Sequence, residues 1–348
     1  MNISVNQSSI EQRQLAVQRL TALWAFSESG LGGILHALQM PFTGLLVGGM
    51  AILLISLIAF FSSGNFKIIL RSVLIVLIVK AIVSPNSPFP AYIAVGFQAV
   101  LGYLIFSVMK INLLSLCILS LLAMFESAVQ KLLILTLFFG QSIWKAADNL
   151  GNFVAKQMAV STIQGSHWII GIYLSIYCLG GFIVAWMAYK TIKGFSSDIP
   201  WVKWNEFPSA GLGVQLPAMQ RKRNKFKWIL IILLVVSVLL YVFAANSKQA
   251  WLDIIKTICW TITAIVVWYQ WVSPFITKGI NKILKRKSSL YAAEITNIIS
   301  FLPVLKQLAA MAWQTTSQYK GVKRLHYFAV LLIHWSLTWT DASIKNTV

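Results

Sequence analysis

Apolar runs of about 20 residues recur along the chain and alternate with short polar breaks. Each run is long enough to cross the hydrocarbon core of a bilayer as one helix. The pattern predicts an all-α polytopic helical membrane protein with about eight to nine transmembrane helices. The predicted spans cover about residues 15–38, 42–61, 66–83, 91–109, 113–139, 167–189, 228–245 and 251–275, and a short aromatic-rich stretch follows at 326–339.

The breaks between these spans carry turn signals. Pro41 disfavours a helical residue before it, which predicts a break at 39–41. The prolines of SPNSPFP at 84–90 predict a non-helical connection, and residues 110–112 predict a tight turn. Within 140–166, apolar residues recur at helical spacing, which predicts an amphipathic helix at the membrane interface.

These signals predict four regions along the chain. Residues 1–14 form a polar tail, and residues 15–190 form a six-helix membrane domain. A cytoplasmic basic and aromatic loop covers 191–227. A second membrane region with cytoplasmic amphipathic helices covers 228–348.

Composition and charge add an orientation. The 348 residues are 58% hydrophobic and only 11% charged, and the net charge is +20. With the N-terminus on the cytoplasmic side, most of the 29 lysines and arginines fall on that side. The positive charge is therefore interpreted as a topology signal and as contact with anionic lipid headgroups, and no nucleic-acid partner is expected. No cleavable signal peptide is expected. The predicted location is a bacterial cytoplasmic (inner) membrane, with several passes.

Polar residues inside the apolar runs are the candidates for binding a solute. A carboxylate at membrane depth is costly unless it is paired or faces a wet cavity. Glu28 and Glu126 are such carboxylates, and each is either a ligand contact or half of an ion pair; for Glu126 the partner would be Lys80 or Lys131. The candidate substrate-binding residues are Glu28, His36, Gln39, Asn86, Tyr92, Gln98, Glu126 and Trp144.

Small residues of the first span indicate close helix packing. They are Ala22, Ala25, Ser29, Gly32 and Gly33. No nucleotide-binding, hydrolase or metalloprotease motif occurs, and the histidines and cysteines are not grouped at the spacing of metal ligands. We therefore expect no catalytic residue, no metal site and no cofactor.

Over about residues 12–190 the chain resembles the substrate-binding subunits (S-components) of energy-coupling-factor vitamin transporters. The resemblance rests on ALWAFSES at 22–29, LQMPFTG at 38–44 and SPNSPFPAYIAVGFQAVLGYLIF at 84–106. It implies a pocket closed by outer loops, and separate coupling and ATPase subunits on the cytoplasmic face. It also implies that Ala22, Ala25 and Ser29 lie on the face that docks to such a subunit. The second half is unrecognised and only faintly similar to the T-components of these transporters.

Three functions compete. The first is a membrane transport protein that binds a small, vitamin-like solute from the outer face. The second is a non-transporting scaffold subunit of an envelope complex, with docking surfaces in 195–227 and 276–325. The third is an intramembrane lipid-modifying enzyme that would use Glu28 and His36.

Overall fold

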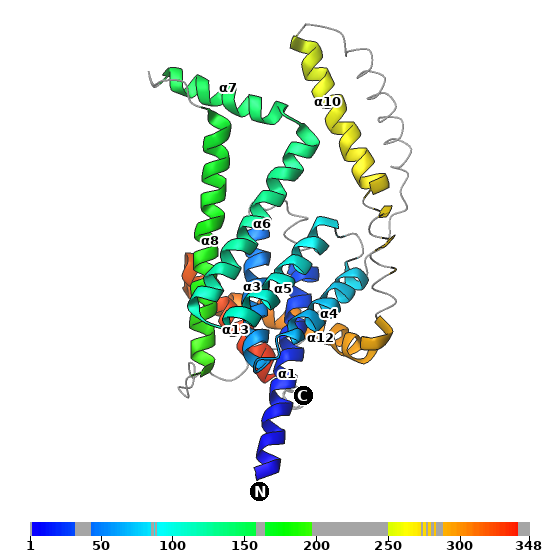
Figure 1. Ribbon diagram of the computed structural model, residues 1–348, viewed down its shortest axis with the longest axis vertical. Helices are drawn as coiled ribbons and strands as arrows, with labels where there is room; N and C mark the ends of the chain where they lie inside the picture. The colour runs from blue at the N-terminus through cyan, green and yellow to red at the C-terminus, as the bar shows by residue number, and fades with distance from the viewer. Residues whose placement is uncertain are drawn as a thin grey trace. The chain divides into compact units, whose positions relative to one another are not determined.

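The structure is a computed structural model, and it describes residues 2–31, 43–84, 87, 89–157, 164–196, 250–272, 274–275, 278–279, 282 and 288–339. Every regular element in this part of the chain is a helix (Figure 1). The longer elements are α1 (Asn2–Phe26), α3 (Thr43–Phe61), α4 (Lys67–Val83), α5 (Phe89–Met109), α6 (Leu113–Phe139), α7 (Ser142–Gln157), α8 (Gly165–Ser196), α10 (Ala250–Val267), α12 (Ala292–Thr315) and α13 (Gly321–Thr338). Two π-helices, η1 (Ser27–Leu31) and η2 (Trp268–Val272), continue α1 and α10.

The chain divides into two compact units. Unit 1 consists of Met1–Ser127, Tyr177–Val214 and Asn281–Val348, and unit 2 consists of Ala128–Ile176 and Gln215–Ile280. The residues of α6 and α8 are therefore shared between the two units.

Helix α1 is the centre of unit 1, because α3, α4, α12 and α13 all pack against it. The second half of α1 and the start of η1 are buried without interruption over residues 20–29. Trp24 and Ala25 are fully enclosed. The helix begins at Asn2, so the polar N-terminal segment continues directly into the buried helix.

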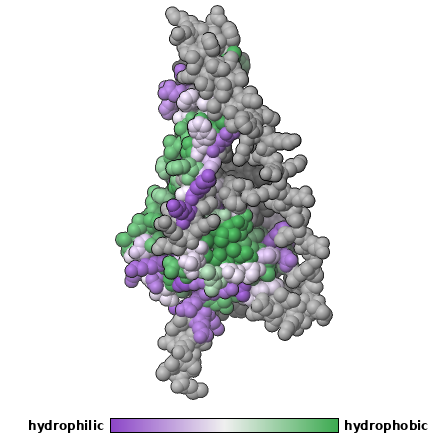
Figure 2. Space-filling model, turned by 90° about the vertical axis from the view of Figure 1, so that its right-hand side faces the viewer, coloured by the Kyte–Doolittle hydropathy of each residue, from purple (hydrophilic) through white to green (hydrophobic). Residues whose placement is uncertain are grey.

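Helix α5 shows how the sequence pattern relates to the surroundings. One face is buried and carries Tyr92 and Gln98. The opposite face exposes large apolar side chains at helical spacing, namely Ile93, Phe97, Val100, Leu104 and Val108. A helix with polar groups inside and apolar groups outside is suited to hydrocarbon rather than to water. Figure 2 shows hydrophobic side chains exposed on one face of the molecule.

Five helices in the described part of the chain are long and apolar enough to cross a membrane. They are Gly44–Phe61, Phe89–Met109, Leu113–Phe139, Gly165–Phe195 and Ser289–Gln318. The prediction of a helical membrane protein is confirmed at this level. The predicted span 228–245 lies outside the described residues, so the count of eight to nine spans stays a prediction, as does the orientation.

The last of these helices differs from the sequence interpretation. We expected residues 289–318 to be part of a moderately polar cytoplasmic region. Over this stretch only Glu294 and Lys306 are charged, and the mean hydropathy reaches 1.4. By length and composition this helix therefore qualifies as a membrane-crossing element, although its polar residues are spread along it.

The tight turn predicted at 110–112 is confirmed, and local chemistry explains it. Lys110 takes a left-handed backbone conformation (φ 54°) that ends α5. Asn112 Oδ1 accepts a 2.8 Å hydrogen bond from the Ser115 N–H, and Ser115 Oγ accepts a 2.9 Å bond from the Asn112 N–H. This reciprocal capping fixes the start of α6 at Leu113.

In unit 2, α7 confirms the helix predicted within 140–166 and packs closely on the start of α8. A Cβ on Gly165 would lie 2.1 Å from the Ala147 carbonyl oxygen, so only glycine fits there. The Ser166 N–H donates a 2.9 Å hydrogen bond to Asp148 Oδ1, which caps the first turn of α8. Close approach and capping thus fix the α7–α8 corner.

Candidate functional site

Glu28 stands at the point where α1 changes into the π-helix η1. The wider turn of a π-helix re-aims the side chains that follow it, and such turns occur frequently at functional sites. Glu28 points towards α4, which contacts η1. Its Oε2 accepts a 2.8 Å hydrogen bond from the Lys80 ammonium, and the two side chains are only 5% and 4% exposed.

Lys80 links this pair to α5. Its Nζ lies 5.8 Å from the centre of the Tyr92 ring, on the aromatic face. The carboxylate of η1, the ammonium of α4 and the ring of α5 therefore form one buried cluster in unit 1. We call Glu28, Lys80 and Tyr92 the ion-pair cluster.

Several buried polar atoms in the described part of unit 1 lack a hydrogen-bond partner. They are Trp24 Nε1, Ser27 Oγ, Tyr92 Oη, Gln98 Oε1, Ser120 Oγ and Glu126 Oε2, with further ones in α13. An unsatisfied buried polar atom costs about 1–3 kcal/mol. Ser27 immediately precedes Glu28, Trp24 lies one helical turn before it, and Tyr92 belongs to the cluster itself, so part of this unused hydrogen-bonding capacity belongs to residues of the cluster or near it in the chain.

Gln98 lies on the same buried face of α5 as Tyr92, about 9 Å further along the helix axis. Gly48 of α3 leaves room for its amide, because a Cβ on Gly48 would be 3.2 Å from Gln98 Nε2. The same position borders Ser127 of α6. The buried face of α5, which carries Tyr92 and Gln98, thus extends from the ion-pair cluster towards α3 and α6.

The structure places the predicted site residues in three groups. Glu28 and Tyr92 are brought together through Lys80, and Gln98 shares the face of Tyr92. Glu126 is part-buried in α6. Trp144 belongs to unit 2, where its Nε1 donates a 3.1 Å hydrogen bond to Thr136 Oγ1. The remaining predicted residues, His36, Gln39, Asn86, Gly32 and Gly33, lie outside the described residues.

The ion pair suggested for Glu126 is not the one observed. Lys80 pairs with Glu28 instead, and the alternative partner Lys131 is exposed. Sequence spacing favoured Glu126 because Lys131 follows it on the same helix. It could not show that η1 packs on α4. Lys80 was therefore missed as a member of the candidate site.

The small residues of the first span are buried within this chain. Ala22, Ala25 and Ser29 are at most 8% exposed, and Ser29 Oγ donates to the Ala25 carbonyl oxygen at 2.5 Å. These residues could pack within the bundle or dock to a partner, and their burial suits packing within the bundle. Docking to a partner stays a prediction.

No protein-family model matches the chain, and no curated protein and no solved structure is significantly similar to it. The resemblance to S-components stays a prediction, and the chemistry of the site has to be argued from the residues themselves.

Proposed function

We propose that the chain is a multi-pass transport protein of the bacterial cytoplasmic membrane that binds a small polar solute. In this proposal the N-terminus is cytoplasmic, the solute enters from the outer face, and separate coupling or ATPase subunits act on the cytoplasmic side. The protein itself performs no chemical reaction.

One observation carries the proposal: a buried ion pair lies beside Tyr92, whose buried hydroxyl has no hydrogen-bond partner in the described residues, and the same holds for the hydroxyl of Ser27, next to Glu28 in the chain. An ion pair needed only to hold helices together gains nothing from unsatisfied neighbours, because each one lowers stability. A bound solute with its own donors and acceptors would satisfy them. The Tyr92 hydroxyl and the Gln98 carbonyl offer hydrogen bonds, and Glu28 and Lys80 offer both signs of charge.

The exposed apolar face of α5 supports the membrane part of the proposal. It presents large side chains outward from Ile93 to Val108, a length of about 22 Å along the axis. This covers much of the hydrocarbon thickness of a bilayer, which is about 30 Å. The buried face of the same helix, which carries Tyr92 and Gln98, is turned away from the lipid. A site for a polar solute belongs on that side.

The test is a binding assay on the full chain purified in neutral detergent. Small molecules extracted from the denatured protein are identified by mass spectrometry, and water-soluble vitamins are screened by thermal shift. We expect a compound that binds saturably and that binds more weakly, by about fivefold or more, to Tyr92→Phe, which lacks one hydrogen-bonding hydroxyl. Tyr103→Phe is the matched control, because it removes a hydroxyl from the same helix outside the cluster and should leave binding unchanged.

A protein that carries no extractable small molecule and binds none of the compounds would contradict the solute proposal. Stable partners without ATPases in native membranes would then favour the scaffold function.

A further inference from the structure

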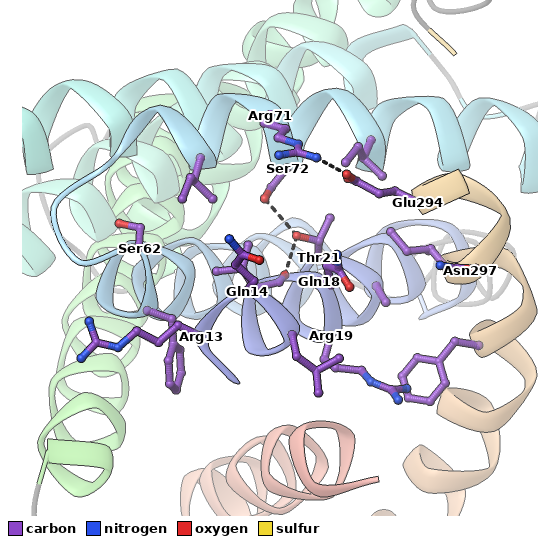
Figure 3. A pocket seen from close by; sticks show the side chains of 18 of the residues that line it. Arg13, Gln14, Gln18, Arg19, Thr21, Ser62, Arg71, Ser72, Glu294 and Asn297 are labelled. Atoms are coloured by element: carbon purple, nitrogen blue, oxygen red, sulfur yellow. Dashed lines mark hydrogen bonds and ion pairs between the residues drawn. The ribbon is translucent and has the colours of Figure 1, made fainter. Parts of the chain in front are cut away.

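A cavity of about 860 Å³ opens in unit 1 at the end of the bundle that holds the first turns of α1. Its walls come from α1, the turn between α3 and α4, the first half of α4, and α12 (Figure 3). It shares no residue with the ion-pair cluster. Its volume is in the range of small-molecule sites in proteins. We call it the arginine pocket.

Three arginines line the arginine pocket, and Glu294 is the only acidic residue among its lining side chains. Arg13 comes from the polar part of α1, Arg19 from one and a half turns further along, and Arg71 from α4. The pocket therefore has an excess of positive charge contributed by two helices.

All three arginines are held in place, and Arg13 and Arg71 keep unused donors. Arg13 Nη1 donates to Ser63 Oγ, and Arg71 Nη2 donates to Glu294 Oε1. The Arg19 guanidinium lies 4.1 Å from the centre of the Phe301 ring. The Arg71 guanidinium also lies 5.6 Å from the centre of the Tyr291 ring. A guanidinium has five N–H donors, so the single hydrogen bond from Arg13 or from Arg71 leaves donors for an anion.

The floor of the arginine pocket is polar and ordered. Thr21 and Ser72 are both 2% exposed, and a 2.9 Å hydrogen bond joins their hydroxyl oxygens. Figure 3 shows Gln14 and Gln18 beside this bond, between α1 and α4. Neutral donors next to arginines are the usual surroundings of a bound oxyanion.

If the arginines served only as a topology signal, neither the pocket nor its hydrogen-bonded floor would be needed. Such a signal needs charge in the loops and no cavity. Here the arginines line an open pocket whose floor carries the buried hydroxyls of Thr21 and Ser72. Their planar, forked donors suit the oxygens of a phosphate group, which an arginine binds with two parallel hydrogen bonds.

We propose that the arginine pocket binds a phosphate-type oxyanion, carried either by the headgroup of an anionic lipid or by a soluble phosphate compound. Arg13 and Arg71 supply charge-assisted hydrogen bonds, and Gln14 and Gln18 supply neutral ones. Glu294 competes with the ligand for Arg71. The site is independent of the proposed solute site, so either proposal can fail without the other.

The experiment uses the full chain, delipidated in neutral detergent, with melting temperature as the readout. One arm titrates sodium phosphate against sodium chloride at matched ionic strength. The other titrates dihexanoyl phosphatidylglycerol against dihexanoyl phosphatidylcholine. We expect a saturable rise in melting temperature in at least one arm, and the arm that responds identifies the source of the phosphate group.

Variants then locate the site. Arg13→Gln and Arg71→Gln should each weaken binding about tenfold, as expected for losing a charge-assisted hydrogen bond. Glu294→Gln should strengthen binding, because it frees the Arg71 fork. Lys67→Gln is the matched control: it removes an exposed positive charge from the same end of α4 without touching the cavity, and it should leave binding unchanged.

The proposal is overturned if neither phosphate nor phosphatidylglycerol produces a saturable shift. It is also overturned if the arginine variants bind as the natural protein does, or if Lys67→Gln weakens binding as much as they do. The last result would mean that net charge, rather than the pocket, attracts the anion.

Discussion

Two carboxylate–cation pairs in the described part of unit 1 share their chemistry and differ in their surroundings. The side chains of Glu28 and Lys80 are 5% and 4% exposed, whereas those of Glu294 and Arg71 are 24% and 54% exposed. A buried pair has lost its hydration and depends on its partner, whereas an exposed pair can exchange its partner for water. Burial, rather than the identity of the charges, therefore decides which pair is fixed and which is open to exchange with a ligand.

The strongest test of this difference removes the buried cation. Lys80→Met leaves Glu28 enclosed without its partner, and breaking a buried pair on one side costs about 3–5 kcal/mol. We expect a loss of this size in the free energy of unfolding, measured by denaturant titration in detergent. The double variant Glu28→Gln with Lys80→Met should recover a large part of the loss, because no uncompensated charge remains. If Lys80→Met were as stable as the natural protein, Glu28 would have to reach water by another route.

A smaller effect is expected from the neutral bond at the floor of the arginine pocket. Thr21→Val leaves the buried Ser72 hydroxyl without its partner, which costs about 1–3 kcal/mol. Thr296→Val is the matched control, because its exposed hydroxyl bonds only to its own helix. The same denaturant titration measures both. If the two variants were equally stable, the α1–α4 bond would contribute nothing.

Breaking the exposed pair should cost less again. Arg71→Gln removes an ion pair that is more than half exposed on the arginine side, and such pairs contribute less than about 1 kcal/mol. The free energy of unfolding of Arg71→Gln should therefore match that of Lys67→Gln within this margin. A loss as large as that of Lys80→Met would remove the distinction between the two pairs.

The smallest effect concerns Asp148, a carboxylate held mainly by hydrogen bonds. Hydrogen bonds from the Ser166 hydroxyl and backbone N–H lower the pKa of Asp148 below its usual value of 3.8. The pKa of Asp148 is lower in the folded protein than in the unfolded chain. Its contribution to stability is therefore present at a pH above the unfolded-state pKa and is lost as the pH falls through the folded-state pKa. Melting temperature followed below pH 4 should fall less steeply for Asp148→Asn than for the natural protein. Equal pH dependence would show that Asp148 does not contribute.

The sequence predicts the helices of unit 1 well because their ends are marked locally. Asn112 and Ser115 form a cap that can be read from four residues, and the predicted span 113–139 matches α6. The π-helix η1 carries no comparable signal. Helix α8 extends to Ser196, beyond the predicted end at residue 189. Its last turns contain polar residues, and the hydrophobic pattern predicts a loop there.

The sites are harder to predict because their members are far apart in the sequence. Glu28 and Lys80 are separated by 52 residues, and Arg71 and Glu294 by 223. Only the packing of α4 and α12 on α1 brings them together. One local signal does exist for the arginine pocket: Gln14, Gln18 and Thr21 repeat at helical spacing where α1 passes from its polar first half to its apolar second half. This stripe predicts a polar contact, although not its partner.

The separation of the buried pair has a consequence for biosynthesis. The ribosome makes Glu28 first, and Lys80 follows after 52 further residues, which takes roughly 3–10 s at the usual rate of translation. During this time the nascent carboxylate has to remain in water or carry a proton, because no cation is available to accompany it out of water. The N-terminal helix can therefore settle into its final place only after α4 has been made. A nascent chain arrested before residue 80 should be a substrate for membrane quality control.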